Sequence, residues 1–178
     1  MLLQLGQRRS SEGLVDLLLE CHGRIRRFLG FARRLATTDG IAAEEVRAVA
    51  GEIRRYFVVA FPMHLEDEDV DITPRLRGTR SDVDAALARM SEDHVSHASL
   101  VSDLIELCVM LERDPLQRDA LASRLAHAAQ ALDAALEPHL VLEERVLFPA
   151  LAELPPHDQE AIHLAIRTRR DRAMRGDA

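Results

Sequence analysis

Apolar residues recur every three or four positions along most of this 178-residue chain, the spacing that places them on one face of an α-helix. The pattern predicts four long helices and a shorter last one, over residues 11–36, 41–71, 81–113, 116–154 and 158–172. Residues that commonly end helices stand between them: Gly40, Gly78, Pro115 and the pair Pro155-Pro156. The chain is therefore expected to be helical throughout.

Short connections join the long predicted helices, which favours antiparallel packing of helices that follow one another in the sequence. At 1.5 Å per residue these helices would be about 40–60 Å long. We predict an all-α fold, an up-down-up-down antiparallel four-helix bundle with a short C-terminal fifth helix. The bundle is assigned to residues 1–155, and residues 156–178 form the last helix and an Arg-rich tail, interpreted as solvated.

Six polar side chains occupy positions on the apolar stripes of the four long helices. In the first helix, His22 stands between Leu18 and Ile25 on one face. The six are His22, His64, Glu68, His94, His139 and Glu143. Side chains on these stripes point into the bundle, where an unpaired ion is strongly unfavourable. A bound metal would remove this penalty for all six residues, which we predict as metal ligands.

An internal repeat relates the two halves of the chain. The segment HLEDEDVDITPRL (64–76) aligns with HLVLEERVLFPAL (139–151), and five of the thirteen positions are identical, including a Pro ten residues after the His. A further His stands 42 residues before the first segment and 45 before the second. The chain thus contains two units of the form His, then His-x-x-x-Glu, and two units predict ligands for two metal ions.

The spacing within each unit suits a dinuclear site. Residues four apart lie one turn apart on the same helix face, so the His and Glu of each unit can bind together. A carboxylate can bridge two ions with its two oxygens, whereas an imidazole binds only one. Two bridging glutamates, four imidazoles and a solvent-derived oxo or hydroxo bridge would leave a position open for a small ligand. Imidazole with carboxylate suits iron, zinc or manganese and disfavours Mg²⁺ or Ca²⁺.

Composition narrows the class of protein. Aromatic residues make up only 3% of the chain, in keeping with an all-α fold, and the net charge of −7 argues against nucleic acid as a partner. We find no apolar run long enough to cross a membrane and no secretory signal. Cys21 and Cys108 follow no metal or redox spacing and are expected to be buried free thiols in a cytoplasmic protein. No feature identifies a protein partner.

The order His, His-x-x-x-Glu, His, His-x-x-x-Glu over residues 11–154 resembles the hemerythrin-like (HHE cation-binding) proteins, most specifically in HLVLEERVLFPAL. The resemblance implies a non-haem di-iron centre that binds or senses O₂, and some members handle NO, peroxide or iron itself. By position, it implies that Glu68 and Glu143 bridge the two irons.

One position departs from the oxygen-carrying hemerythrins, which have a further His four residues after the first His of the third helix. Here that position is Ala98, and His97 lies one residue earlier. His97 could reach the metal, but a solvated His97, or one that touches the ligands without binding metal, is favoured. A missing fifth imidazole would leave the second iron more open, which suits redox reactivity better than reversible O₂ carriage.

Three functions are compatible with these features. We favour a protein that binds or senses O₂ or a related small oxidant, because no motif indicates a pocket for an organic substrate, and a dedicated enzyme is not the first choice. The alternative is a di-iron enzyme acting on NO or peroxide, or an iron donor or store. A third possibility is a redox-silent bundle that holds zinc or manganese.

Overall fold

The structure, a computed structural model, describes residues 13–175, which form helices joined by short turns and contain no strand. The first half contains α1 (Leu14–Thr37), α2 (Ala43–Arg55), η1 (Tyr56–Ala60), α3 (Phe61–Glu66), η2 (Asp67–Ile72) and α4 (Thr73–Leu76). The second half contains α5 (Ser81–Arg113), η3 (Pro115–Gln117), α6 (Arg118–Leu142), η4 (Glu143–Leu147), α7 (Phe148–Ala152) and α8 (Pro156–Arg175). The predicted all-helical fold is confirmed for the described residues.

The observed helix ends lie close to the predicted ones. The stretch predicted over 41–71 continues to Leu76, and the last helix is longer at both ends than 158–172. The predicted start at residue 11 lies outside the described residues. Gly40 and Gly78 have φ angles of 69° and 79°, a left-handed conformation that glycine adopts without strain, and each closes a turn between helices.

Three π-helical segments, η1, η2 and η4, interrupt the predicted continuous helices. Each is followed, two residues later, by a proline: Pro62, Pro74 and Pro149. The residue before each proline donates its N–H to the carbonyl five residues back, as Thr73 does to Glu68 and Phe148 does to Glu143. Proline lacks an N–H and its ring clashes with the carbonyl four residues back, and a wider turn accommodates this.

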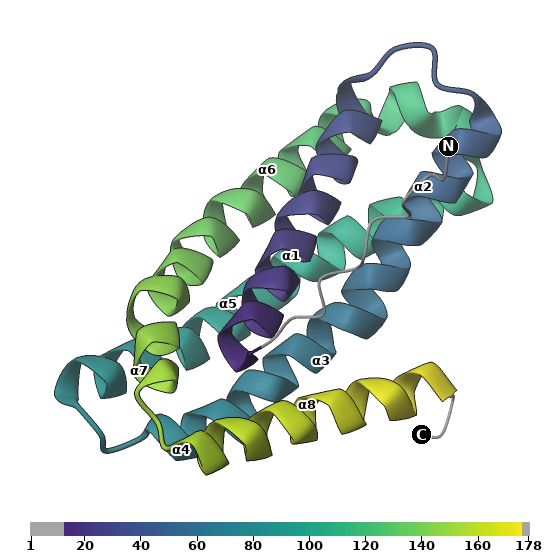
Figure 1. Cartoon of the computed structure of the whole chain (residues 1–178). Helices are drawn as coiled ribbons and strands as arrows, with labels where there is room; N and C mark the ends of the chain where they lie inside the picture. The colour runs from purple at the N-terminus through teal and green to yellow at the C-terminus, as the bar shows by residue number, and fades with distance from the viewer. Residues whose placement is uncertain (1–12, 176–178) are drawn as a thin grey trace, which may run out of the picture.

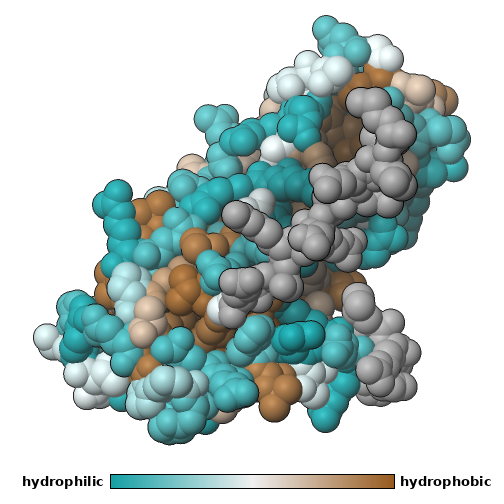
Figure 2. Space-filling model, viewed as in Figure 1, coloured by the Kyte–Doolittle hydropathy of each residue, from teal (hydrophilic) through white to brown (hydrophobic). Residues whose placement is uncertain are grey.

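The four long helical stretches pack as a bundle (Figure 1). Helix α1 packs against α2 and α6, and α5 packs against α2 and α6, so the contacts form a closed ring. Helix α8 crosses one end of this bundle and contacts α1 and η2. In Figure 2, apolar surface is visible between α8 and the rest of the bundle, among mostly hydrophilic residues.

The buried apolar residues form two separate clusters along the bundle. One includes Ile25 and Leu136, and the other includes Leu18, Leu147 and, from α8, Ile166. Polar predicted ligands lie between the clusters: along α1, for example, His22 follows Leu18 of one cluster and precedes Ile25 of the other. The bundle therefore contains a buried polar layer between two apolar cores.

By length and composition alone, helix α5 could cross a membrane, which was not anticipated from the sequence. Its most apolar 18-residue window has a mean hydropathy of 1.3. The same helix packs between α2 and α6 and carries His94, one of the predicted ligands. Core helices of soluble bundles share this length and composition, so the feature is weak evidence for a membrane span.

Candidate metal centre

The structure brings the six sequence-predicted ligand side chains together in the polar layer. They come from six elements, His22 from α1, His64 from α3, Glu68 from η2, His94 from α5, His139 from α6 and Glu143 from η4. They form two overlapping groups, in each of which one ligand atom per residue lies within 4.8 Å of the others. We call His22, His64, Glu68 and Glu143 the first cluster, and His94, His139, Glu68 and Glu143 the second cluster.

Each glutamate directs one oxygen toward each cluster. Glu68 Oε1 lies 3.1 Å from His64 Nε2, and its Oε2 lies 3.2 Å from His94 Nε2. Glu143 Oε2 lies 3.0 Å from His22 Nε2, and its Oε1 lies 2.9 Å from His139 Nε2. Both carboxylates are thus placed to bridge two ions. The two imidazoles of each cluster come from one repeat, and the two glutamates are shared.

Two bound metal ions would explain the arrangement of the six side chains better than hydrogen bonds among these side chains do. Eleven buried side-chain nitrogen and oxygen atoms in residues 13–175 have no hydrogen-bond partner, and ten of them belong to the six predicted ligands. Unpaired buried polar atoms are costly, and protein interiors normally avoid them. Two ligand atoms that bind the same metal ion, each at about 2.1 Å as for zinc, lie about 3 Å apart when the angle between them at the metal is a right angle. The nitrogen–oxygen distances of 2.9–3.2 Å match that arrangement.

Acidic residues lie beside the outer nitrogens of three of the imidazoles. His22 Nδ1 donates a hydrogen bond to Glu144 Oε1 at 2.8 Å, which leaves its Nε2 as the inward-facing atom. His94 Nδ1 lies 3.4 Å from Asp69 Oδ1. Glu144 directly follows Glu143, and Asp69 directly follows Glu68. Each repeat therefore contributes the acid that lies beside the first imidazole of the other repeat. Such contacts orient histidine ligands in metal sites.

Asp93 lies beside the third of these imidazoles and was not predicted from the sequence. Its Oδ2 lies 3.5 Å from His139 Nδ1, and its other oxygen contacts Arg89 at 2.9 Å. Asp93 is buried. The sequence does contain a signal for the burial of Asp93, because Met90, Asp93 and His97 follow the helical spacing of the inward face of α5.

Burial sets the protonation states of the metal-free side chains. It lowers the pKa of His64 to about 3 and also lowers the pKa of His94, so both imidazoles are neutral at pH 7 and can donate a lone pair. Burial and repulsion by Glu143 raise the pKa of Glu68 well above its usual value. Two carboxylates this close resist being charged together unless a cation lies between them, which is what a bridging metal pair would supply.

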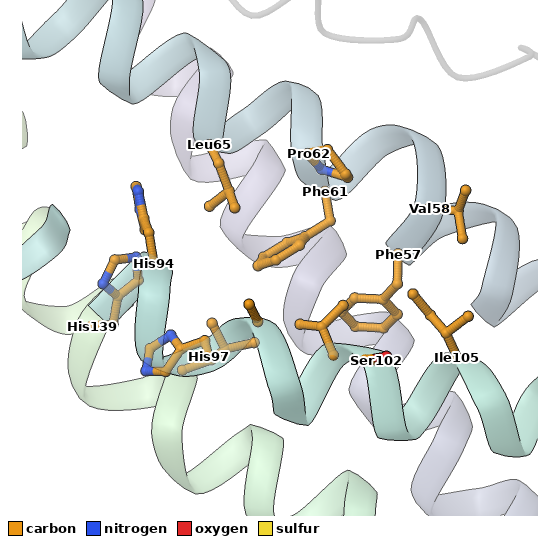
Figure 3. Close-up of a pocket in the computed structure, with 13 residues that line it drawn as sticks. Phe57, Val58, Phe61, Pro62, Leu65, His94, His97, Ser102, Ile105 and His139 are labelled. Carbon is orange, nitrogen blue, oxygen red and sulfur yellow. The ribbon is translucent and has the colours of Figure 1, made fainter. Parts of the chain in front are cut away.

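His97 is buried and is not solvated, contrary to one of the interpretations from the sequence. It is only 6% exposed, lies in neither cluster, and its ring packs edge-on against His139 with centroids 5.4 Å apart. Together with His94 and His139 it lines one end of a pocket of about 350 Å³ between the η1–α3 stretch and α5 (Figure 3). The second cluster therefore borders a cavity, whereas His22 and His64 of the first cluster do not line it.

The Arg-rich segment of α8 also differs from its interpretation as a solvated tail. Arg169 and Arg170 both contact Asp67, a fully buried carboxylate that directly precedes Glu68. Arg169 further contacts Asp71 at 2.7 Å, and Arg170 lies 3.2 Å from Cys21 Sγ. Ion pairs thus hold helix α8 beside the two clusters of predicted ligands. Cys21 and Cys108 are buried free thiols, as predicted.

Comparison with known protein families supports the metal-binding interpretation. The family described as hemerythrin HHE cation-binding domain matches residues 13–115, more than half of the chain. The match includes His22, His64, Glu68 and His94 and stops before the second His-x-x-x-Glu unit. Among curated proteins, no relative matches this chain.

Proposed function

This chain belongs to the hemerythrin HHE cation-binding domain family, and we propose that it is a non-haem di-iron protein that binds or senses O₂ or a related small oxidant. The observation that carries the proposal is the pair of clusters that share Glu68 and Glu143. In this proposal His22 and His64 hold one ion, His94 and His139 hold the other, and both glutamates bridge. The ions, completed by an oxo or hydroxo bridge, would supply redox chemistry and an open position for a small ligand.

The arrangement of the chain supports this assignment. The ring of helix contacts and the short turns agree with the predicted up-down-up-down antiparallel order, which we keep as part of the proposal together with the division into residues 1–155 and 156–178. The pocket beside His94 and His139 offers a small ligand a route to the second cluster. We also propose a cytoplasmic location, in keeping with two unpaired thiols.

Metal analysis of protein purified from its native host tests the identity of the ions. The proposal expects two iron atoms per chain. Zinc or manganese in place of iron would instead indicate a redox-silent bundle, and an absence of bound metal would refute the assignment.

Anaerobic loading with Fe(II), followed by exposure to O₂, tests the reaction. A lasting visible absorption change that tracks O₂ supports binding or sensing. Rapid loss of the change with repeated turnover would favour the alternative, a di-iron enzyme acting on peroxide or NO. Release of iron on oxidation would favour an iron donor or store.

A further inference from the structure

The pocket beside the second cluster is much larger than a diatomic gas requires. Its volume of about 350 Å³ is roughly ten times the share of one water molecule in the liquid and lies within the range of sites for small organic ligands. It is formed by η1 and α3 on one side, α5 on the other, and α6 at its inner end. The pocket can therefore hold a molecule with a carbon skeleton.

The lining has one polar end and an apolar body. His94, His97 and His139 lie at one end, and Phe57, Val58 and Ile105 lie at the other (Figure 3). Between the ends the wall is formed by apolar residues except for Ser102. From His97 to Ile105, α5 rises about 12 Å. This shape suits an elongated apolar molecule with a single polar end.

His97 marks the place of that polar end. The residue is only 6% exposed and lines the pocket, and its ring takes part in no hydrogen bond among residues 13–175. Imidazole always offers at least one N–H donor, and the ring of His97 lines the pocket. An oxygen-bearing ligand end placed at His97 would accept a hydrogen bond from this ring.

The pocket opens to solvent without any rearrangement. Val58 is 46% exposed, and Pro62, Ala98 and Ser102 are exposed as well. The inner wall, in contrast, is formed by buried residues such as Phe57 and Phe61. A ligand can enter between the η1–α3 stretch and α5 and place its polar end next to the second cluster.

We propose that this pocket binds a small organic molecule with a hydrocarbon body and one hydrogen-bonding oxygen, the body lying along Phe57, Phe61 and Ile105 and the oxygen at His97. Because His94 and His139 line the same end, the bound oxygen lies beside the second metal position. The inference goes beyond the proposed function, since the pocket is formed by the protein alone.

Calorimetric titration with 1-octanol tests the proposal on the metal-free full chain, with benzene as a purely apolar probe. The wild-type protein is expected to bind both in a saturable manner. His97→Phe keeps the ring but removes the hydrogen bond, so binding of 1-octanol should weaken about five- to tenfold while binding of benzene is unchanged. Equal affinity of the wild type and His97→Phe for 1-octanol would overturn the placement of the oxygen.

A matched pair of variants locates the site. Val58 lines the pocket and neighbouring Val59 does not, although the two are similarly exposed at 46% and 47%. Val58→Trp should fill the mouth and reduce the affinity for both probes at least tenfold, and Val59→Trp should leave it unchanged. No saturable binding to the wild type, or equal effects of the two substitutions, would overturn the proposal. Failure of the chain to bind iron would refute the metal assignment and leave this result standing.

Discussion

Ten of the twelve imidazole nitrogens and carboxylate oxygens of the six clustered residues are buried without a hydrogen-bond partner, so the protein bears a free-energy penalty at this layer in the absence of metal. The ligand set is also minimal, because each cluster has only two imidazoles of its own. Removing one imidazole should therefore affect one ion far more than the other.

His139→Ala should lower bound iron well below two per chain, because it removes one of the two imidazoles of the second cluster. His97→Ala serves as the control, since His97 touches His139 but belongs to neither cluster. Its iron content is expected to equal that of the wild type by elemental analysis. Loss of iron in His97→Ala would make His97 a ligand.

Asp93→Ala should weaken metal binding about 10- to 100-fold, because Asp93 orients the ring of His139 from outside the cluster. The neighbouring Glu92 is exposed, and Glu92→Ala should leave the affinity unchanged. Competition against a chromogenic chelator measures both affinities with zinc. Similar affinities of the two variants would show that Asp93 does not support the site.

The clustered residues could be predicted because histidine and glutamate recur at helical spacing in both repeats. The outer contacts could not be predicted to the same degree. Arg169 and Arg170 reach Asp67 across about 100 residues of chain, and such a contact leaves no periodic trace in the sequence.

At the scale of elements, the helices were predicted almost to their ends, whereas the π segments were not. One extra residue in a short turn hardly changes the spacing of apolar positions, so periodicity cannot reveal it. The sequence feature that marks two of these π segments is the Pro that both repeats carry ten residues after the His. Pro74 and Pro149 follow η2 and η4, and the shared glutamates lie in these two segments.

Helix α8 is expected to stabilise the fold through its apolar face as well as its arginines. Ile166 is fully buried against the cluster that contains Leu18, and Ile166→Ala should lower the free energy of unfolding by about 2–5 kcal/mol. Leu164 in the same helix is 66% exposed, so Leu164→Ala should change the free energy of unfolding by less than about 0.5 kcal/mol. Urea denaturation measures both. Equal effects would mean that α8 does not dock as described.

At the scale of the whole molecule, the buried polar layer joins the two repeats and separates two apolar cores. The sequence predicted that two repeats would supply the ligands for two metal ions, but the sharing of both glutamates depends on how the helices pack. Since an ion can reach all its ligands only in the folded chain, binding should stabilise the fold as a whole.

Metal should accordingly raise the melting temperature. A ligand at 100 times its dissociation constant adds about 2.7 kcal/mol per site to the stability of the folded state. Thermal unfolding of metal-free protein with increasing zinc should show a rising midpoint, and excess chelator should return it to the metal-free value. An unchanged midpoint at saturating metal would contradict binding within the fold.

The one-sided position of the pocket has a kinetic consequence. In the proposed centre, a chelator could approach an ion held by His94 and His139 from the cavity, whereas an ion held by His22 and His64 would be enclosed and could leave only when helices separate. Removal of metal by a chelator should proceed in two phases of equal amplitude, the slower one accelerating with mild urea. The protein would then pass through a half-loaded species with a single ion, which mass spectrometry under native conditions can detect.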